Sequence, residues 1–361
     1  MTKDTIRVLV VDDSPTMCDI LISMIQDAPG LQVVGAARDG LEAIEMTANL
    51  RPDIITMDIR MPRLNGLDAT RRIMSTTPTP IIVVASNIYE SDMNIAFNAT
   101  SVGALTVVEK PHGLDPSSYD AVRQQIISTI QLMADVQVVA LAPDGPSGQP
   151  AMPATPQVPA SFSPTTPCEL IAIAASSGGP GVLREILRSL PADLSIPIVI
   201  VQHITRGFGQ GFAHWLDSLT PLQVLLAQQG EVLKPGQVLL APEDKHLTLA
   251  PGNTVQLDQT EPINGLRPSA TRLFSSIAEV YGAAATGLIL SGEGEDGVAG
   301  LEQLQAAGGN VIAQTEESCV VPSMPKAAIE RGVADRILTP GEIAAAVLQL
   351  DQHRKLHSTT S

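Results

Sequence analysis

The stretch IAIAASSGGPGVLREILRSL, residues 171–190, decides how this chain folds. An apolar run of strand type ends in two serines and two glycines, and a helical pattern follows at once. A strand, a tight turn and a helix in this order form the repeating unit of a parallel α/β sheet. The turn has two chemical interpretations: its glycine-rich backbone cradles a phosphate, or one of its serines is a nucleophile.

The same alternation of strand and helix patterns runs through both halves of the 361-residue chain. Strand-like runs in the first half read IRVLVV, LQVVGAA, DIITMD, PIIVVAS and ALTVVE, and those in the second half read LIAIAAS, PIVIVQH, QVLLA, TGLILSG and NVIAQ. Amphipathic stretches lie between many of them. We therefore predict two α/β domains, each with a doubly wound parallel sheet.

The two halves are separated by a segment of different composition. Residues 136–168 contain eight prolines and, apart from Asp144, no charged side chain. Proline removes a backbone donor and favours extended chain, so this segment is typical of a semi-stiff tether. We predict one domain over residues 1–133, a proline-rich linker over 134–167 and a second domain over 168–361.

Charge and cysteine content exclude several classes of protein. The net charge is -16 and neither half is basic, which argues against nucleic acid as a partner because phosphate binding needs clustered Lys and Arg. The three cysteines show no C-x-x-C spacing, so neither a disulfide framework nor a zinc site is indicated. The chain shows neither a signal-peptide core nor an 18-residue apolar run, and we expect a cytoplasmic protein.

Polar side chains follow four predicted strands of the first half. These side chains are Asp12 and Asp13, Asp58, Ser86, and Lys110. Carboxyl ends of parallel strands share one sheet edge, so these groups converge there. Carboxylates at such an edge suit Mg²⁺, and Asp58 is then a candidate phosphoryl acceptor whose phosphate Lys110 and Ser86 bind. Taken one at a time, the same acidic residues also fit turn-forming or helix-capping roles.

This arrangement, with RMPRLNG after Asp58, resembles a response-regulator receiver over residues 5–133. The resemblance implies a flavodoxin-like doubly wound parallel sheet, phosphorylation of Asp58, and Mg²⁺ ligation by Asp13 and Asp58 with Asp12 assisting. One position departs from the family pattern: receivers often carry an aromatic residue three positions before the lysine, where this chain has Val107.

The second half supplies a nucleophile, a base and an acid at three predicted strand ends. The turn after the first strand offers Ser176, the strand PIVIVQH ends in His203, and TGLILSG leads into a loop with Asp296. Such a set fits a Ser-His-Asp triad, with Ser177 as a weaker nucleophile candidate. A phosphate-binding turn remains the alternative, although the order G-x-G-x-x-G and a P-loop lysine are missing.

Other acidic residues and histidines of this half have simpler interpretations. Glu293 and Glu295 either replace Asp296 as the acid or form a solvated acidic loop or metal site with it. We expect His214 and His246 to be structural.

Several segments resemble the catalytic domain of the CheB family of chemotaxis protein-glutamate methylesterases over residues 168–350. The matching segments are IAASSGGP, VIVQHI, SGEGEDGVAG, LAPEDKHLTL, RPSATRLFSSIA and QTEESCVVPSMPKAAI. The resemblance implies that Ser176 is the nucleophile, His203 the base and Asp296 the orienting acid, with no cofactor in the esterase site. It also implies hydrolysis of glutamyl γ-methyl esters on chemoreceptors, deamidation of receptor glutamines, and a histidine kinase as phosphodonor.

Three positions depart from that family pattern. The family usually has Gly at Ala174, Thr at Ser177 and Met at Glu293. A carboxylate at position 293 disfavours a developing oxyanion if it faces the cleft. A phosphorylation-dependent adaptor that binds receptors without cleaving them is therefore the second interpretation, and methanol release separates the two.

Overall fold

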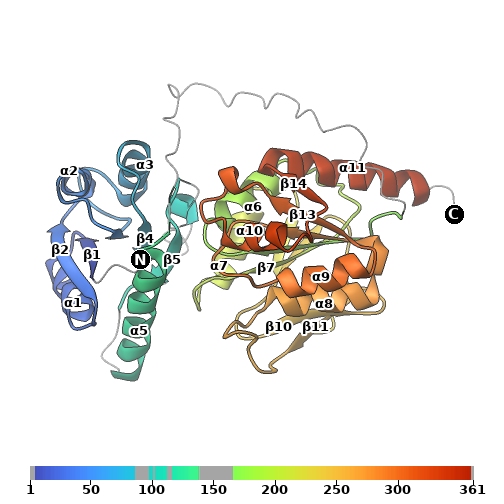
Figure 1. Cartoon of the computed structure of the whole chain (residues 1–361), viewed down its shortest axis with the longest axis horizontal. Coiled ribbons are helices and arrows are strands. Elements are labelled where there is room, and N and C mark those ends of the chain that lie inside the picture. The colour runs from blue at the N-terminus through green and yellow to red at the C-terminus, as the bar shows by residue number, and fades with distance from the viewer. Residues whose placement is uncertain are drawn as a thin grey trace. The chain divides into compact units, whose positions relative to one another are not determined.

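The computed structural model describes residues 5–85, 97–100, 102–111, 116–136, 138 and 166–358. Contacts between residues divide the chain into two compact units, Met1–Ser147 and Gly148–Ser361, drawn in blue to green and in green to red in Figure 1. Both units alternate strands with helices, as the sequence predicts. Over the described residues, no helix is both long and apolar enough to cross a membrane.

The first unit is built on a five-stranded parallel sheet in the order β2-β1-β3-β4-β5. Its strands are β1 (Ile6–Val11), β2 (Leu31–Ala37), β3 (Ile54–Met57), β4 (Ile81–Ala85) and β5 (Thr106–Glu109). Strands β3 and β4 are buried along their whole length, as expected for a sheet covered by helices on both faces. This strand order is the flavodoxin-like one, so the predicted fold class of the first domain is confirmed.

Three of the helices described in the first unit begin at a capping side chain. They are α1 (Pro15–Gln26), α2 (Gly40–Leu50), α3 (Gly66–Thr76) and α5 (Pro116–Met133). The side chains of Ser14, Asp39 and Asn65 accept hydrogen bonds from the first free N–H groups of α1, α2 and α3. Helix α1 contacts α5 and helix α2 contacts α3 (Figure 1).

The second unit contains a seven-stranded parallel sheet in the order β14-β13-β12-β6-β7-β9-β8. Its strands are β6 (Leu170–Ala175), β7 (Ile198–Gln202), β8 (Gln223–Leu226), β9 (Gln237–Leu240), β12 (Ala285–Ile289), β13 (Asn310–Gln314) and β14 (Arg336–Leu338). The chain leaves β6 toward β7 on one side and later returns to β12 on the other. The strand order therefore reverses at β6, which is where α/β sheets open a crevice for ligands.

Helices cover both faces of this second sheet. They are α6 (Gly179–Arg188), α7 (Gly209–Asp217), α8 (Ala270–Val280), α9 (Val298–Ala306), α10 (Ser323–Glu330) and α11 (Pro340–Ser358), with short 3₁₀ turns at Gly282–Ala284 and Glu316–Ser318. Helix α8 packs on α9, and α6 packs on α11 (Figure 1).

Alternate residues of β6 face the layer made by α8 and α9. Leu170, Ala172 and Ala174 belong to one buried apolar cluster with side chains of those two helices, such as Phe274 and Leu301. Side chains alternate along a strand, so the intervening residues of β6 face the opposite layer. Both sets are fully buried, which makes β6 the centre of the unit.

One element departs from the predicted alternation of strands and helices. Strands β10 (His246–Ala250) and β11 (Thr254–Asp258) form an antiparallel hairpin between β9 and α8. Its inner residues Leu247, Leu249 and Val255 join the same apolar cluster as α8. The hairpin therefore extends the core of the second unit beyond the parallel sheet.

The close contact between α8 and α9 predicts a stability effect at Gly300. A Cβ at this position would lie 2.6 Å from the carbonyl oxygen of Thr271 and 2.7 Å from Cβ of Phe274. We expect Gly300→Ala to lower the free energy of unfolding by about 1–3 kcal/mol, because a packed interface has to separate. Thermal unfolding followed through the buried, single tryptophan, Trp215, reports on this unit.

Gly341 in α11 is the matched control for this substitution. A Cβ there meets no described atom within 4 Å. Gly341→Ala should therefore be neutral or slightly stabilising. Equal melting temperatures for both variants would contradict the packing explanation.

Candidate functional site

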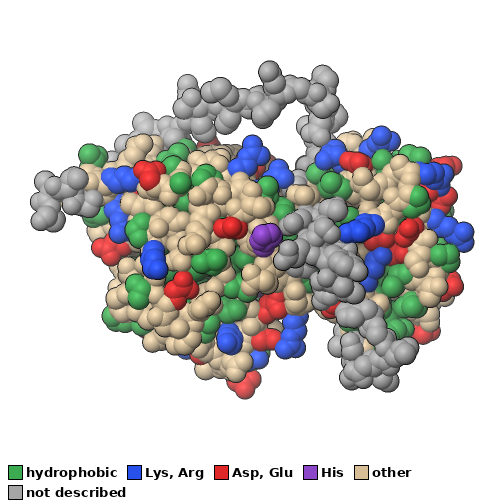
Figure 2. Space-filling view, turned by 180° about the vertical axis from the view of Figure 1, so that it is seen from behind, with side chains coloured by type: hydrophobic (Ala, Val, Ile, Leu, Met, Phe, Trp, Pro, Cys, Tyr) green, Lys and Arg blue, Asp and Glu red, His purple; other side chains and the backbone are tan. Residues whose placement is uncertain are grey.

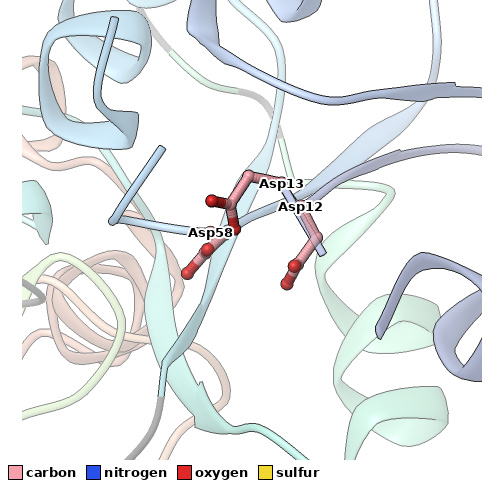
Figure 3. Close-up of side chains that lie close together, drawn as sticks. All are labelled: Asp12, Asp13 and Asp58. Atoms are coloured by element: carbon pink, nitrogen blue, oxygen red, sulfur yellow. The ribbon is translucent and has the colours of Figure 1, made fainter. Parts of the chain in front are cut away.

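The first unit gathers its acidic residues where the strand order reverses between β1 and β3. Asp12 and Asp13 follow β1, and Asp58 follows β3. One carboxylate oxygen from each of the three lies within 4.8 Å of the others. Figure 3 shows the three side chains gathered at the ends of the two neighbouring strands. The predicted convergence of these carboxylates is therefore present in the structure.

Lys110, directly after β5, reaches the same cluster. Its Nζ lies 2.7 Å from Oδ2 of Asp12 and 2.9 Å from Oδ1 of Asp58. The backbone N–H of Ile59 also donates to Oδ1 of Asp58, at 2.7 Å. Ser86, the other predicted phosphate-binding residue, lies outside the described residues.

The charge balance of this cluster suits a divalent cation. Burial raises the pKa of the Asp58 carboxyl, and the Asp12 carboxylate adds to that effect while Lys110 opposes it. Burial would lower the pKa of Lys110, but Asp58 and Asp12 outweigh burial and raise it. Two of the three carboxylates, those of Asp12 and Asp58, thus pair with one ammonium group. Their hard oxygen donors fit Mg²⁺, which takes one or two carboxylates, waters and a phosphate oxygen.

Gly66 lets α3 begin directly against Asp58. A Cβ on Gly66 would lie 2.0 Å from the backbone oxygen of Asp58, and the Gly66 N–H donates to the Ile59 carbonyl at 2.9 Å. This contact explains why the loop RMPRLNG has to end in glycine. It also fixes the backbone that presents the Asp58 side chain.

The second unit places Ser176 at the carboxyl end of β6, at the start of the turn to α6. The N–H of Ser176 donates to the carbonyl of Ser291 at 3.0 Å, and its own carbonyl accepts from Gly179 at 2.9 Å. Gly178 has a φ of 77°, a left-handed conformation that glycine adopts without strain. The quoted SSGG therefore forms a sharp turn at the sheet edge, in which Ser176 is half-buried and the next three residues are buried.

His203 follows β7, the neighbour of β6. The backbone N–H of His203 donates to the carbonyl of Ala175, at 2.9 Å. The side-chain amide of Gln202 donates to the carbonyls of both Ser176 and His203, each at 2.8 Å. Gln202 thereby connects the turn of Ser176 to His203, a contact that the sequence did not reveal.

Asp296, in the loop after β12, binds the imidazole of His203. Its Oδ2 lies 2.9 Å from Nε2 of His203 and accepts from the N–H of Ala270 at 2.6 Å. Its Oδ1 accepts from the hydroxyl of Ser269 at 2.7 Å and from the N–H of Thr271 at 3.1 Å. The carboxylate thus occupies the N-terminus of α8, where free N–H groups and the helix dipole favour negative charge.

These contacts keep Asp296 ionised. Burial alone would raise the pKa of its carboxyl, but His203, Ser269 and the Ala270 N–H hold that pKa well below its usual range. A permanently ionised carboxylate on Nε2 fixes the ring so that Nδ1 is the nitrogen free to take a proton. Among the described residues, Ser176 and His203 are not yet hydrogen-bonded to each other, as is common in unliganded hydrolases.

The other acidic residues of this loop have different partners. Glu293 is half-buried, and its Oε2 accepts from the hydroxyl of Ser323 at the start of α10, at 3.2 Å. Glu295 is exposed and pairs with Arg331 at 2.8 Å. Of the three acidic candidates, Asp296 is the one that touches His203.

In the first unit, three carboxylates and a lysine lie where the order of a parallel sheet reverses. In the second unit, Ser, His and Asp lie at the corresponding edge of another parallel sheet. Together these features define a response regulator whose output domain is a hydrolase. The comparisons with known proteins agree. Residues 8–116 match the response regulator receiver domain, and residues 171–347 match the CheB methylesterase domain. The chain belongs to the CheB methylesterase family.

Relatives align over almost the whole chain. The protein-glutamate methylesterase/protein-glutamine glutaminase 4 of Myxococcus xanthus is 43% identical over 345 residues, covering 96% of this chain and 97% of that protein. An Anaeromyxobacter dehalogenans protein, protein-glutamate methylesterase/protein-glutamine glutaminase 3, is 42% identical and covers 94% and 97%. The solved CheB methylesterase catalytic domain of Thermotoga maritima is 40% identical, with a TM-score of 0.49, over 51% of this chain and 98% of that one.

The carboxylate cluster of the first unit predicts the outcome of removing Asp58. With Mg²⁺ and a small-molecule phosphodonor such as acetyl phosphate, we expect Asp58→Asn to abolish incorporation of labelled phosphate, because the acceptor oxygen is lost and one ligand oxygen is removed. The matched control is Asp19→Asn on the exposed side of α1, which should incorporate phosphate normally. Acid-stable label that persists in residues 1–133 of the Asp58 variant would contradict the assignment.

Proposed function

We propose that the protein hydrolyses glutamyl γ-methyl esters on chemoreceptors, releases methanol, and deamidates specific receptor glutamines by the same chemistry. The observation that carries the proposal is the Asp296–His203 hydrogen bond of 2.9 Å at the sheet edge where the half-buried Ser176 lies. This is the arrangement that activates a serine nucleophile. The names of the relatives support the substrate class.

The first half-reaction transfers the glutamyl acyl group to the enzyme. Oγ of Ser176 attacks the ester carbonyl, and its proton passes to Nδ1 of His203 while Asp296 stabilises the imidazolium formed. The tetrahedral intermediate collapses, the C–O bond to the methoxy group breaks, and methanol leaves with the proton from His203. We infer that the backbone N–H of Gly178, the N-cap residue of α6, stabilises the oxyanion, since it makes no hydrogen bond to another described residue.

The second half-reaction returns the enzyme to its starting state. His203 removes a proton from water, the resulting hydroxide attacks the acyl group, and the glutamate carboxylate is released as Ser176 takes back its proton. With a glutamine substrate, ammonia replaces methanol as the leaving group. No step calls for a cofactor in this site.

The first unit provides the control. We infer that a histidine kinase donates a phosphoryl group to Asp58, and that Lys110 and Ser86 bind the aspartyl phosphate. Mg²⁺ held by Asp13 and Asp58, with Asp12 assisting, would offset the charge of the incoming phosphoryl group. We propose the domain limits 1–133 and 168–361, a linker over 134–167, and a cytoplasmic location that gives access to the receptor helices.

The contacts of Glu293 bear on the adaptor alternative. Its carboxylate accepts a hydrogen bond at the N-terminus of α10, which favours negative charge. A carboxylate stabilised there has less influence on the oxyanion than one that faces the cleft without a partner. The position that most favours a non-catalytic adaptor is therefore compatible with catalysis.

The triad predicts equal losses from three different substitutions. We expect Ser176→Ala, His203→Gln and Asp296→Asn each to reduce methanol release by several orders of magnitude, with little further loss when they are combined, because the three side chains act as a unit. Methanol release from methylated receptor membranes measures the effect, and Glu295→Gln is the control with activity near wild type. Near-normal release by Ser176→Ala would overturn the assignment and make Ser177 the next candidate.

The proposed phosphorylation of Asp58 predicts that a phosphodonor changes the esterase rate and that this change requires Asp58. Adding a phosphodonor and Mg²⁺ should increase methanol release by the wild-type chain and leave the rate of Asp58→Asn unchanged. Asp19→Asn should respond as the wild type does. A phosphodonor effect of the same size in the Asp58 variant would show that control does not pass through this residue.

A further inference from the structure

His246 is a completely buried histidine that the proposed reaction does not use. It opens strand β10 and has no exposed surface. Its Nδ1 lies 3.2 Å from the backbone nitrogen of Ser269, and its Nε2 lies 3.2 Å from the carbonyl oxygen of Glu261. A backbone N–H only donates and a carbonyl only accepts, so Nδ1 is the acceptor and Nε2 carries the proton. The ring is therefore a neutral imidazole of one tautomer.

Ser269 connects this histidine to the triad. Its hydroxyl donates to Oδ1 of Asp296 at 2.7 Å, and Oδ2 of the same carboxylate binds Nε2 of His203 at 2.9 Å. Both Ser269 and Asp296 are buried. A continuous chain of hydrogen bonds thus runs from His246 through Ser269 and Asp296 to the catalytic imidazole.

The helix does not need the Ser269 hydroxyl for its own cap. Ser269 occupies the N-cap position of α8, yet its side chain makes no capping hydrogen bond. The Asp296 carboxylate accepts from the first N–H groups of the helix, those of Ala270 and Thr271, in its place. The hydroxyl is directed instead to Asp296, where it holds the oxygen that does not touch His203.

We propose that Ser269 and His246 are positioning residues of the esterase: His246 fixes the Ser269 backbone, and Ser269 fixes the rotation of the Asp296 carboxylate that aims His203. The inference rests on the proposed function for the reaction that these residues support, whereas the contacts that carry it involve only the triad, Ser269 and His246. Without the Ser269 hydroxyl, Oδ1 keeps one donor, the Thr271 N–H, and the carboxylate turns more freely. The imidazole then spends less time aimed at Ser176, which lowers kcat and leaves substrate binding unchanged.

Substitutions at Ser269 test the first link. We expect Ser269→Ala to lower kcat for methanol release about tenfold, corresponding to about 1.4 kcal/mol, with KM unchanged. Ser269→Thr retains a hydroxyl and should recover most of the rate. Ser275→Ala is the matched control, because the Ser275 hydroxyl bonds to the Thr271 carbonyl one turn further along the same helix. A kcat in Ser269→Ala equal to that of Ser275→Ala would overturn the proposal.

Two substitutions of His246 separate positioning from a merely structural role. Asparagine places an acceptor where Nδ1 lies and can still hold the Ser269 N–H, whereas glutamine places its amide nearer Nε2 and retains only the bond to Glu261. We expect His246→Gln to lose about tenfold in kcat, and His246→Asn to stay within about threefold of the wild type, at equal KM. Trp215 fluorescence gives the melting temperature of each. Equal kcat values in the two variants, or losses that follow melting temperature alone, would overturn the proposal.

The rate at which a fluorophosphonate probe labels Ser176 provides a readout that does not depend on the substrate. Ser269→Ala and His246→Gln should be labelled about tenfold more slowly than the wild type, and Ser269→Thr close to the wild-type rate. A wild-type protein that is labelled but releases no methanol would overturn the proposed substrate while these ratios still test the positioning. Unchanged labelling rates in both variants would overturn the positioning itself.

Discussion

The burial of the Asp296 carboxylate at the start of α8 is the interaction on which the esterase unit depends. Four donors from four residues satisfy its two oxygens, and one of them is the imidazole of His203. A buried carboxylate without such donors would be protonated or would destabilise the fold. The same contacts therefore cap a helix, connect the loop after β12 to α8, and set the tautomer of His203. Stability and chemistry cannot be varied separately at this residue.

Both units bury carboxylates at a sheet edge, but they compensate the negative charge differently. In the esterase unit, neutral donors and one imidazole compensate a single buried carboxylate. In the receiver unit, three carboxylates gather and two of them pair with Lys110, so negative charge exceeds positive charge in the described part of that site. The donors around Asp296 offset its charge within the esterase site, whereas the receiver site is suited to a divalent cation and a phosphoryl group. Both lie at the carboxyl ends of strands, where a parallel sheet reverses its order.

The fold class, and the side chains that gather at the two sheet edges, were predictable because strand ends are visible in the sequence. An apolar run followed by Asp12, Asp58 or His203 marks both the element and its functional edge. The antiparallel hairpin was less visible, because polar residues interrupt both of its strands, HLTLA and TVQLD. Supporting residues such as Ser269, Ser291 and Gln202 could not be predicted, since their partners are set by packing between distant segments. The same holds for Glu293: the sequence shows that the residue is unusual, whereas its contact with Ser323 is visible only in the structure.

The pairing of β6 with β12 also bears on the order in which the two units fold during synthesis. Leu170 of β6 pairs with Ala285 of β12, so the central strand of the esterase sheet cannot pair with β12 until more than a hundred further residues have been synthesised. The receiver strands, by contrast, are all complete by Glu109. Domains fold largely as units from the N-terminus during translation, and contacts distant in sequence form slowly. On the ribosome, the regulatory unit is therefore in place before the enzyme that it controls exists.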